Sequence, residues 1–215
     1  MAASRSRRPA PILKRAIEEH KRAAYREAIL EAAASVFGRL GFGAAKIADI
    51  AAEAGVSVGT LYNYFKNKDA VIDSLVTHES SHYREFVRDA EQIEEPVERI
   101  RQLIDASYRF LERHGALLAM AVREGVFQRE IAEQHFGESR GEVHFYIIGV
   151  YEGALTEAAA AGAVRNDVTP SALAVMLDGA VSSLAFDWVR RGRTQSLHDL
   201  SAVVFDTFMK GAQVR

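Results

Sequence analysis

The amino-acid sequence predicts an all-α protein of about nine helices, and its periodicity leads to this fold class. Ala, Leu, Glu and Arg recur at spacings of three and four residues, the period of amphipathic helices. The alternation of β-branched residues that is typical of strands is scarce. The chain has only four prolines, and Pro96 and Pro170 each stand where a helix is expected to begin.

The first predicted elements lie in a basic N-terminal region. Residues 1–15 are expected to form a disordered, basic arm. A helix is then expected from about Lys14 to Leu40, ending at Gly41. Its apolar face is predicted from positions four residues apart, namely Ala24, Ala28, Ala32, Val36 and Leu40, widened by Ile29, Ala33 and Phe37.

Short helices follow at 47–54 and 58–65, and a longer one runs from about Lys68 to Asp89. Gly55 suits the left-handed conformation that often ends a helix. Ser57 and Asn67 are the expected N-caps of the third and fourth helices. Later helices are expected at 96–113, 115–124, 139–161, 170–191 and 196–210.

Composition excludes several classes of protein. The chain of 215 residues has 48% hydrophobic residues, enough for a sizeable core, and no cysteine, which excludes disulfides, thiolate nucleophiles and Cys-based metal sites. The basic N-terminus lacks the apolar run of a signal peptide, and no stretch of about 18 apolar residues is present. We therefore expect a soluble, cytoplasmic protein without a membrane segment.

The charge is unevenly distributed along the chain. Residues 1–68 hold 12 Lys and Arg against 6 Asp and Glu, whereas residues 69–215 hold 15 against 23. A cationic N-terminal part beside an acidic remainder indicates that the N-terminal part binds a polyanion.

The two short helices, joined through AGVS, have the spacing of a helix-turn-helix. Leu61 and Phe65 lie four residues apart and can face the core, so Val58, Tyr62 and Asn63 cannot all join them. Exposed hydroxyl, amide and ammonium groups suit DNA phosphates and base edges. The N-terminus of the fourth helix, with Lys68, adds a further phosphate site.

The run from Ile29 to Asp73, ILEAAASVFGRLGFGAAKIADIAAEAGVSVGTLYNYFKNKDAVID, resembles the DNA-binding domain of the TetR family of bacterial transcriptional repressors. The shared pattern is A-x-x-x-F-x-x-x-G-F, then D-I-A-x-x-A-G-V-S, then G-T-L-Y-x-Y-F-x-x-K. The rest of the chain agrees in length, helicity and the placing of two long final helices. The resemblance implies a helix-turn-helix DNA-binding domain over 16–68 and a helical effector-binding and dimerisation domain over 69–215.

The resemblance also assigns DNA-binding roles to matching positions. Base edges would be read by Val58, Gly59 and Asn63, and phosphates would be held by Ser57, Thr60, Tyr62, Tyr64 and Lys68. Family members usually carry Ser or Thr where this chain has Ala45 and Lys46. A hydroxyl cap and phosphate contact is therefore lost, and Lys46 is expected to replace the contact by charge. Because few side chains reach base edges, part of the specificity is expected to rest on DNA shape.

A homodimer on a palindromic operator is expected, since one such module buries little surface on DNA. The last two long helices carry more apolar residues than a peripheral pair needs, and the resemblance also places the dimer contact there. The expected dimer residues are Leu177, Val181, Leu184, Trp188, Val204 and Phe208. The alternative is that these residues complete the core of the monomer.

The resemblance further implies a pocket among the middle helices for an unidentified small-molecule effector that releases the DNA. Its candidate contacts are polar or aromatic residues on apolar faces: Tyr108, Met120, Arg123, Phe127, His144, Tyr151 and Asp178. No cofactor is expected. His78 and His82 have a spacing that can hold a metal, but a surface position is the simpler interpretation, so no metal site is expected.

Two other functions remain open from the sequence. One is a helical enzyme, although no nucleophile elbow or phosphate-binding glycine loop is present. The other is a non-specific or architectural DNA-binding protein, which the acidic remainder of the chain disfavours.

Overall fold

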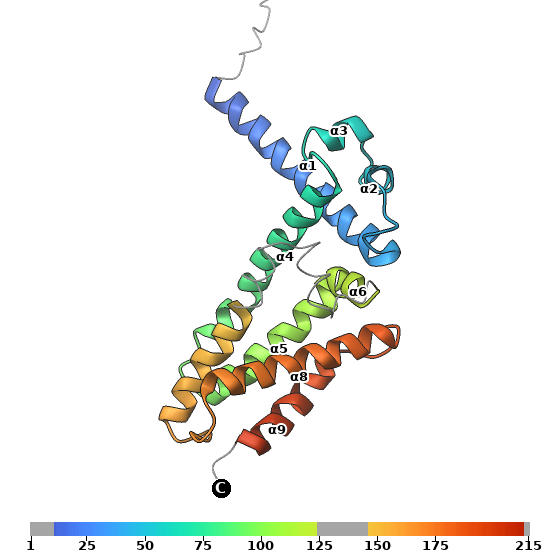
Figure 1. Ribbon diagram of the computed structural model, residues 1–215. Helices are drawn as coiled ribbons and strands as arrows, with labels where there is room; N and C mark the ends of the chain where they lie inside the picture. Colours follow the sequence, from blue (N-terminus) through green and yellow to red (C-terminus); the bar gives the residue numbers. More distant parts are fainter. Residues whose placement is uncertain (1–10, 124–145, 213–215) are drawn as a thin grey trace, which may run out of the picture.

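The computed structural model of the chain describes residues 11–123 and 146–212. All regular structure within these two ranges is helical, which confirms the predicted all-α class. Helices α1 to α3 lie at one end of the molecule, and α8 and α9 lie toward the other (Figure 1). The long helix α4 leads from the first group into the second (Figure 1).

The N-terminal helices are α1 (Pro11–Leu40), α2 (Ile47–Glu53), α3 (Val58–Tyr62) and α4 (Lys68–Glu91). Because α1 begins at Pro11, residues 11–15 are helical, whereas the sequence predicted a disordered arm up to residue 15. Proline suits the first helical position, and an ion pair of 2.8 Å between Arg15 Nε and Glu19 Oε1 links the first turns. Residues 1–10 of the predicted arm lie outside the described residues.

The larger C-terminal part contains α5 (Pro96–His114), α6 (Ala116–Arg123), a helix over 146–160, α8 (Pro170–Arg190) and α9 (Ser201–Ala212). The final helix was predicted from residue 196, but a short 3₁₀ turn, η1 (His198–Leu200), precedes α9. The Glu112 carboxylate accepts the backbone N–H groups of Leu197 and His198 and so fixes this turn.

The predicted caps of the short helices are confirmed. The Ser57 hydroxyl accepts the N–H of Thr60 at 3.0 Å, and the Asn67 side chain accepts the N–H of Ala70 at 2.8 Å. Gly55 has a φ of 66°, the left-handed conformation that its position between α2 and α3 requires.

The buried face of α1 agrees with the prediction in its middle and differs at its ends. The predicted residues Ile29, Ala32, Ala33, Val36 and Phe37 are buried, together with Leu30, whereas Ala24, Ala28 and Leu40 are exposed. The first turns of α1 extend past the other helices (Figure 1), and residues 13–28 are exposed. The alanine spacing therefore continues into a part of the helix that is not buried.

The buried apolar residues form two cores, and α4 belongs to both. Its first half contributes residues such as Val71 and Leu75 to the N-terminal core, which also contains Met120 of α6. Its second half contributes Tyr83 and Val87 to the C-terminal core. The N-terminal core thus continues to Val76, beyond the domain boundary expected at residue 68.

A second link between the two cores is α6, which packs against α1 and also contacts α8. The approach to α1 is close at Gly38, where a Cβ atom would lie 3.3 Å from the backbone oxygen of Ala116. Helices α4 and α6 are therefore two elements through which the C-terminal part can act on the N-terminal part.

Within the described residues, α8 is the one helix long and apolar enough by composition to cross a membrane, a feature not expected from the sequence. It packs against α5, α6 and α9. Its buried residues include Leu173, Leu177 and Val181, so helix packing accounts for much of its apolar character.

Candidate functional site

The second helix of the helix-turn-helix, α3, exposes one face and buries the other. Leu61 and Phe65 are buried in the N-terminal core, as predicted. Beside them on α3, Val58 is 40% exposed and Tyr62 is 51% exposed. An apolar group and a phenol hydroxyl are thus accessible to a partner surface at the start and the end of α3.

The smaller polar residues of this face are also accessible. Gly59 and Asn63 are exposed and Thr60 is half-buried. The hydroxyls of Ser57 and Thr60 lie 2.8 Å apart, so they hold each other at the start of α3. Their exposure leaves them able to donate to a phosphate oxygen as well.

Tyr64 is held differently from Tyr62. It is half-buried, and its ring stacks on Tyr25 of α1 with centroids 6.1 Å apart. The guanidinium carbon of Arg22 lies 6.0 Å from the Tyr64 ring centroid. Tyr64 therefore joins α3 to α1, and α1 brings arginine to the candidate DNA surface.

Lys68 begins α4, as predicted, and its ammonium has partners within the chain. It donates to the backbone oxygens of Phe42 at 2.6 Å and Ala45 at 3.0 Å, and it lies 4.4 Å from the Phe42 ring centroid. These contacts tie the start of α4 to the turn before α2. They give Lys68 a structural role, and its phosphate contact stays a prediction.

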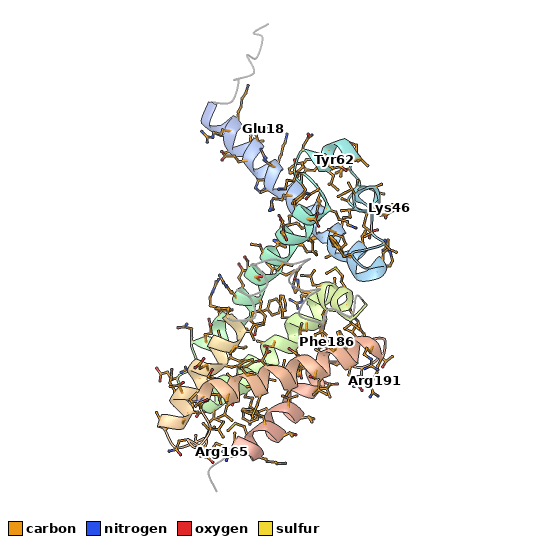
Figure 2. The ribbon with its side chains drawn as sticks, in the orientation of Figure 1. Glu18, Lys46, Tyr62, Arg165, Phe186 and Arg191 are labelled. Carbon is orange, nitrogen blue, oxygen red and sulfur yellow. The ribbon has the colours of Figure 1, made fainter. Side chains whose placement is uncertain are left out.

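The unusual pair before α2 also has a structural consequence. Ala45 is buried, and Lys46 is an exposed N-cap residue whose side chain does not cap the helix. The Asp49 carboxylate accepts the backbone N–H of Lys46 at 2.9 Å instead. Lys46 and Tyr62 lie at the same end of the molecule, away from α8 and α9 (Figure 2), so the Lys46 ammonium remains available to a phosphate.

The N-terminal half of α1 contributes residues that were not selected from the sequence. A surface hollow of about 460 Å³ separates it from α3. Charged and polar side chains line the hollow: the basic Arg15, Lys21 and Arg22, the acidic Glu18 and Glu19, and Tyr25, Thr60, Asn63 and Tyr64. Basic residues thus continue past the predicted arm along α1, beside α3.

A second site is a cavity of about 250 Å³ between the two cores. It is lined by Val76, Glu79, Ser80 and Tyr83 of α4, by residues of α5 and α6 including Phe110, His114, Leu117 and Met120, and by Ile147, Tyr151, Asp178, Val181, Ser182 and Phe186. Apolar groups predominate, with a few polar groups among them, which is the usual make-up of a small-molecule site.

Three hydroxyls form a buried chain at this cavity. The Ser107 hydroxyl lies 2.9 Å from the Tyr83 hydroxyl and 3.1 Å from the Tyr151 hydroxyl, and it also donates to Leu103 O at 2.7 Å. Burial raises the pKa of both tyrosines above its ordinary value. The hydroxyls are therefore neutral hydrogen-bonding groups for a ligand.

An acid and a base face each other on another part of the wall. Glu79 Oε2 lies 3.2 Å from His114 Nδ1. Burial raises the pKa of Glu79 to about 7, and burial also lowers the pKa of His114. Within the described residues, this Glu79 oxygen accepts no hydrogen bond.

The predicted effector contacts divide into three groups. Met120, Tyr151 and Asp178 line the cavity. Tyr108 is buried but does not line it. Phe127 and His144 lie outside the described residues, as does the side chain of Arg123.

Several residues that complete the cavity were not predicted from the sequence. Ser107 is a single polar residue on the buried face of α5, a signal that could have been used. Glu79 and His114 come together from different helices, and no local pattern indicates their pairing. Val181, predicted as a dimer contact, lines the cavity instead.

A larger hollow of about 690 Å³ lies between α4, α5 and η1. Exposed charged residues such as Asp89, Arg109 and Arg113 line it, so it is a surface groove. The smaller cavity is the better candidate for a small-molecule site because its lining is mostly apolar and includes the buried Tyr83, Phe110 and Tyr151.

The predicted dimer residues are mostly part of the monomer core. Leu177, Val181, Trp188 and Val204 are buried, Phe208 is partly buried, and Leu184 is 36% exposed. The prediction rested on the number of apolar residues on these helices and on the resemblance, but most of the residues named face inward. The exposed apolar residues are Val175, Met176 and Leu184 of α8 and Val203 of α9.

Residues 29–75 match the profile of the family described as bacterial regulatory proteins, tetR family. The chain is 26% identical to the fatty acid metabolism regulator protein of Bacillus subtilis over 200 residues, which are 90% of this chain and 97% of that protein. It is 34% identical over 92 residues to the HTH-type transcriptional repressor KstR2 of Mycobacterium tuberculosis, covering 41% of this chain and 44% of the repressor.

The same fold occurs in the crystal structure of the transcriptional regulator FadR from Bacillus subtilis in complex with stearoyl-CoA. The TM-score is 0.76 at 22% identity, over 87% of this chain and 99% of that one. Likeness of fold thus covers both the helix-turn-helix and the helices around the cavity.

Proposed function

Because the chain belongs to the TetR family of bacterial regulators, we propose that it is a transcriptional repressor that binds a palindromic operator as a homodimer and is released by a small-molecule effector. The helix-turn-helix supplies the DNA surface, and the cavity between the two cores supplies the effector site. Binding and release, rather than catalysis, is the proposed role, and its proposed place is the cytoplasm.

The observation that carries this proposal is the position of the cavity. Its walls include Val76 and Glu79 of α4 and Leu117 and Met120 of α6. Val76 and Met120 are at the same time buried members of the N-terminal core. A ligand that separates these helices must therefore displace groups that hold the helix-turn-helix. The ligand would then bind the DNA-binding and the released conformations with different affinity, which coupling between the two sites requires.

On the DNA side, the proposed base contacts are Val58, Gly59 and Asn63 in the major groove. Ser57, Thr60 and Tyr62 would hold phosphates, with Lys46 beside them. Tyr64 would take part mainly by positioning α3 against α1. The basic side chains of α1 would add charge-driven, sequence-independent affinity.

For the effector we propose a long apolar chain with one hydrogen-bonding head, of the class of long-chain acyl-CoA thioesters. The similar FadR structure contains stearoyl-CoA, and the mostly apolar lining of this cavity supports the same class. Because the Ser107 proton is donated to Leu103 O, the donor to a thioester carbonyl would be the Tyr83 or Tyr151 hydroxyl, which would turn its proton from Ser107 to the ligand. A cavity of about 250 Å³ is smaller than most ligand sites, so binding of such a chain would widen the gap between α4, α5 and α6.

The proposed dimer surface is the exposed face of α8 with part of α9. Met176 and Leu184 lie eight residues apart on α8, a spacing that places them on one side of the helix, and Val203 is an exposed apolar residue of α9. Contact between two copies would bury these residues and set the distance between the two recognition helices.

Footprinting of the purified protein on the DNA upstream of its own coding region tests the proposal. We expect one short protected segment with two-fold sequence symmetry, its half-sites about one helical turn apart. Protection spread evenly along the fragment would contradict the repressor and would favour the non-specific DNA-binding alternative.

A further inference from the structure

Two histidines and a glutamate come together where α4 passes the end of α5. Glu79 and His82 lie one turn apart on α4, and His114 is the last residue of α5. One ligand atom from each of the three lies within 4.8 Å of the other two. All three residues are half-buried.

These side chains are the donor set of a zinc-type site. Imidazole nitrogens and a carboxylate oxygen bind Zn²⁺ at about 2.0–2.2 Å, and three protein ligands with an open fourth position are a common arrangement. Tetrahedral ligands at that distance lie about 3.4 Å from one another. The three ligand atoms now lie within 4.8 Å of one another. Side-chain rotations that move each atom by roughly 1 Å would bring them to the distance that tetrahedral coordination requires.

The surroundings hold these groups in place. The His114 ring stacks on Phe110 with centroids 4.8 Å apart and meets the edge of Phe86 at 5.6 Å. The His82 ring lies 5.3 Å from the His114 ring. A site assembled from side chains that packing already orients loses less freedom on binding a metal.

A simple ion pair between Glu79 and His114 is the alternative explanation. Their closest atoms are 3.2 Å apart, yet Glu79 Oε2 is buried and accepts no hydrogen bond within the described part of the chain. The His82 ring contacts the rings of His78, with centroids 4.2 Å apart, and His114, and an ion pair between Glu79 and His114 does not involve it. A cation among the three groups would give the buried oxygen a partner and would account for both histidines.

We propose that Glu79, His82 and His114 bind one divalent transition-metal ion of the zinc class. The ion would join α4 to the end of α5. Glu79 and His114 also line the cavity, so the ion would lie on the cavity wall. It would thereby fix the helix that leads from the helix-turn-helix into the effector site.

Calorimetric titration of ZnCl₂ into the metal-free, full-length protein tests this proposal, with no DNA or effector present. We expect one ion per chain. The nearly isosteric Glu79→Gln and the partly exposed His82→Ala should each weaken binding by more than about 100-fold, above the loss typical of residues that only support a ligand. His198→Ala removes a histidine that pairs with Asp105 away from the cluster, and should bind as the wild type does.

Titration with Co²⁺ gives a second measurement, since tetrahedral coordination produces strong visible absorption that both variants should lose. Thermal unfolding in chelator, compared among the variants, establishes that each is folded. Zinc binding that is equally tight in the wild type and in a Glu79→Gln, His82→Ala double variant would overturn the site. Because no DNA is involved, that result would leave the proposed repressor function untouched.

Discussion

Lys68 illustrates how a single side chain can serve the fold where charge alone suggested DNA. Its ammonium donates to the carbonyls of Phe42 and Ala45. Lys68→Met keeps the length of the side chain but leaves both carbonyls without this donor. We expect the free energy of unfolding to fall by about 1–3 kcal/mol in chemical denaturation. The matched control is Lys66→Met, an exposed position in the same turn, and equal stability of the two variants would refute the structural role.

The exposed residues of α3 should separate affinity from specificity. Tyr62→Ala should weaken binding to all DNA sequences by about 1 kcal/mol, because it removes a phosphate contact and leaves the buried side of α3 intact. Asn63→Ala should change the preferred sequence more than the overall affinity, because an amide reads a base edge. Selection from random DNA measures both, and an unaltered preference for Asn63→Ala would exclude that residue from base reading.

At single residues, the sequence predicted local contacts well and distant contacts poorly. Ser57 and Asn67 cap helices within three residues of themselves, so their roles follow from local spacing. The acceptors of Lys68 lie 23 and 26 residues away. The Glu79 and His114 pair likewise depends on how two helices cross, which no local pattern encodes.

Among the elements, the contact of α1 with α6 is sensitive to a single methyl group. At Gly38 a Cβ would meet the Ala116 backbone at 3.3 Å, whereas at Gly153, also in a helix, nothing lies within 4 Å. Gly153→Ala should therefore raise the free energy of unfolding by about 0.5–1 kcal/mol through helix propensity. Gly38→Val should lower it by about 1–3 kcal/mol, because backbone must move.

Thermal and denaturant unfolding of these two glycine variants checks the prediction. If α6 carries the effector signal, Gly38→Val should also reduce the change in DNA affinity that the effector causes. A Gly38→Val protein as stable as the wild type and equally responsive would mean that the contact between α1 and α6 has no such role.

The turn before α9 should depend on the charge of Glu112. Burial raises the pKa of this carboxyl, but hydrogen bonds from Ser196, His198 and Leu197 together bring it below its ordinary value. A lowered folded-state pKa gives stability that is present above the unfolded value of 4.5 and is lost as pH falls through the folded pKa. Glu112→Ala should lower the free energy of unfolding by about 1 kcal/mol at pH 7, since solvent weakens the contacts of this partly exposed carboxylate. Below about pH 4 the free energies of unfolding of the variant and the wild type should become more alike.

Unfolding followed at pH 7 and in acid measures this dependence. Glu85→Ala, an exposed position on α4, is the control for loss of a carboxylate. If the loss of unfolding free energy in Glu112→Ala were the same at acidic pH as at pH 7, packing rather than the charge of Glu112 would hold the turn.

Helix limits were predictable from proline and glycine positions, and helix faces were predictable in part. Pro96, Gly55 and Pro170 begin or end helices at the expected places. On α1 the predicted residues from Ile29 to Phe37 are buried, but Ala24 and Ala28 are exposed because the helix extends beyond the N-terminal core. On α8 the largest apolar residues face the monomer core, and the smaller number left exposed marks the candidate dimer face.

For the whole molecule, dimer formation should depend on that exposed face. Met176 is 62% exposed, so Met176→Glu should leave the monomer folded and separate the dimer. Sedimentation should then give the mass of one chain, and operator binding should be lost because half-sites would be bound singly. Ala160→Glu, exposed on the helix over 146–160, should remain dimeric. A dimeric Met176→Glu protein would place the interface elsewhere.

The helical fold with a DNA-binding end was predictable because the residues that define a helix-turn-helix lie close together in the sequence. The cavity was predictable only in part: Met120, Tyr151 and Asp178 line it, but its position across two cores follows from the shared helices α4 and α6. That position joins DNA binding to effector binding in one proposal.

Fluorescence anisotropy of labelled operator DNA during titration with stearoyl-CoA tests the proposal most directly. We predict that stearoyl-CoA lowers DNA affinity by about tenfold or more, that free CoA does not, and that Ser182→Phe, which fills the cavity, loses the response. Unchanged DNA affinity while stearoyl-CoA is demonstrably bound would contradict the proposed coupling.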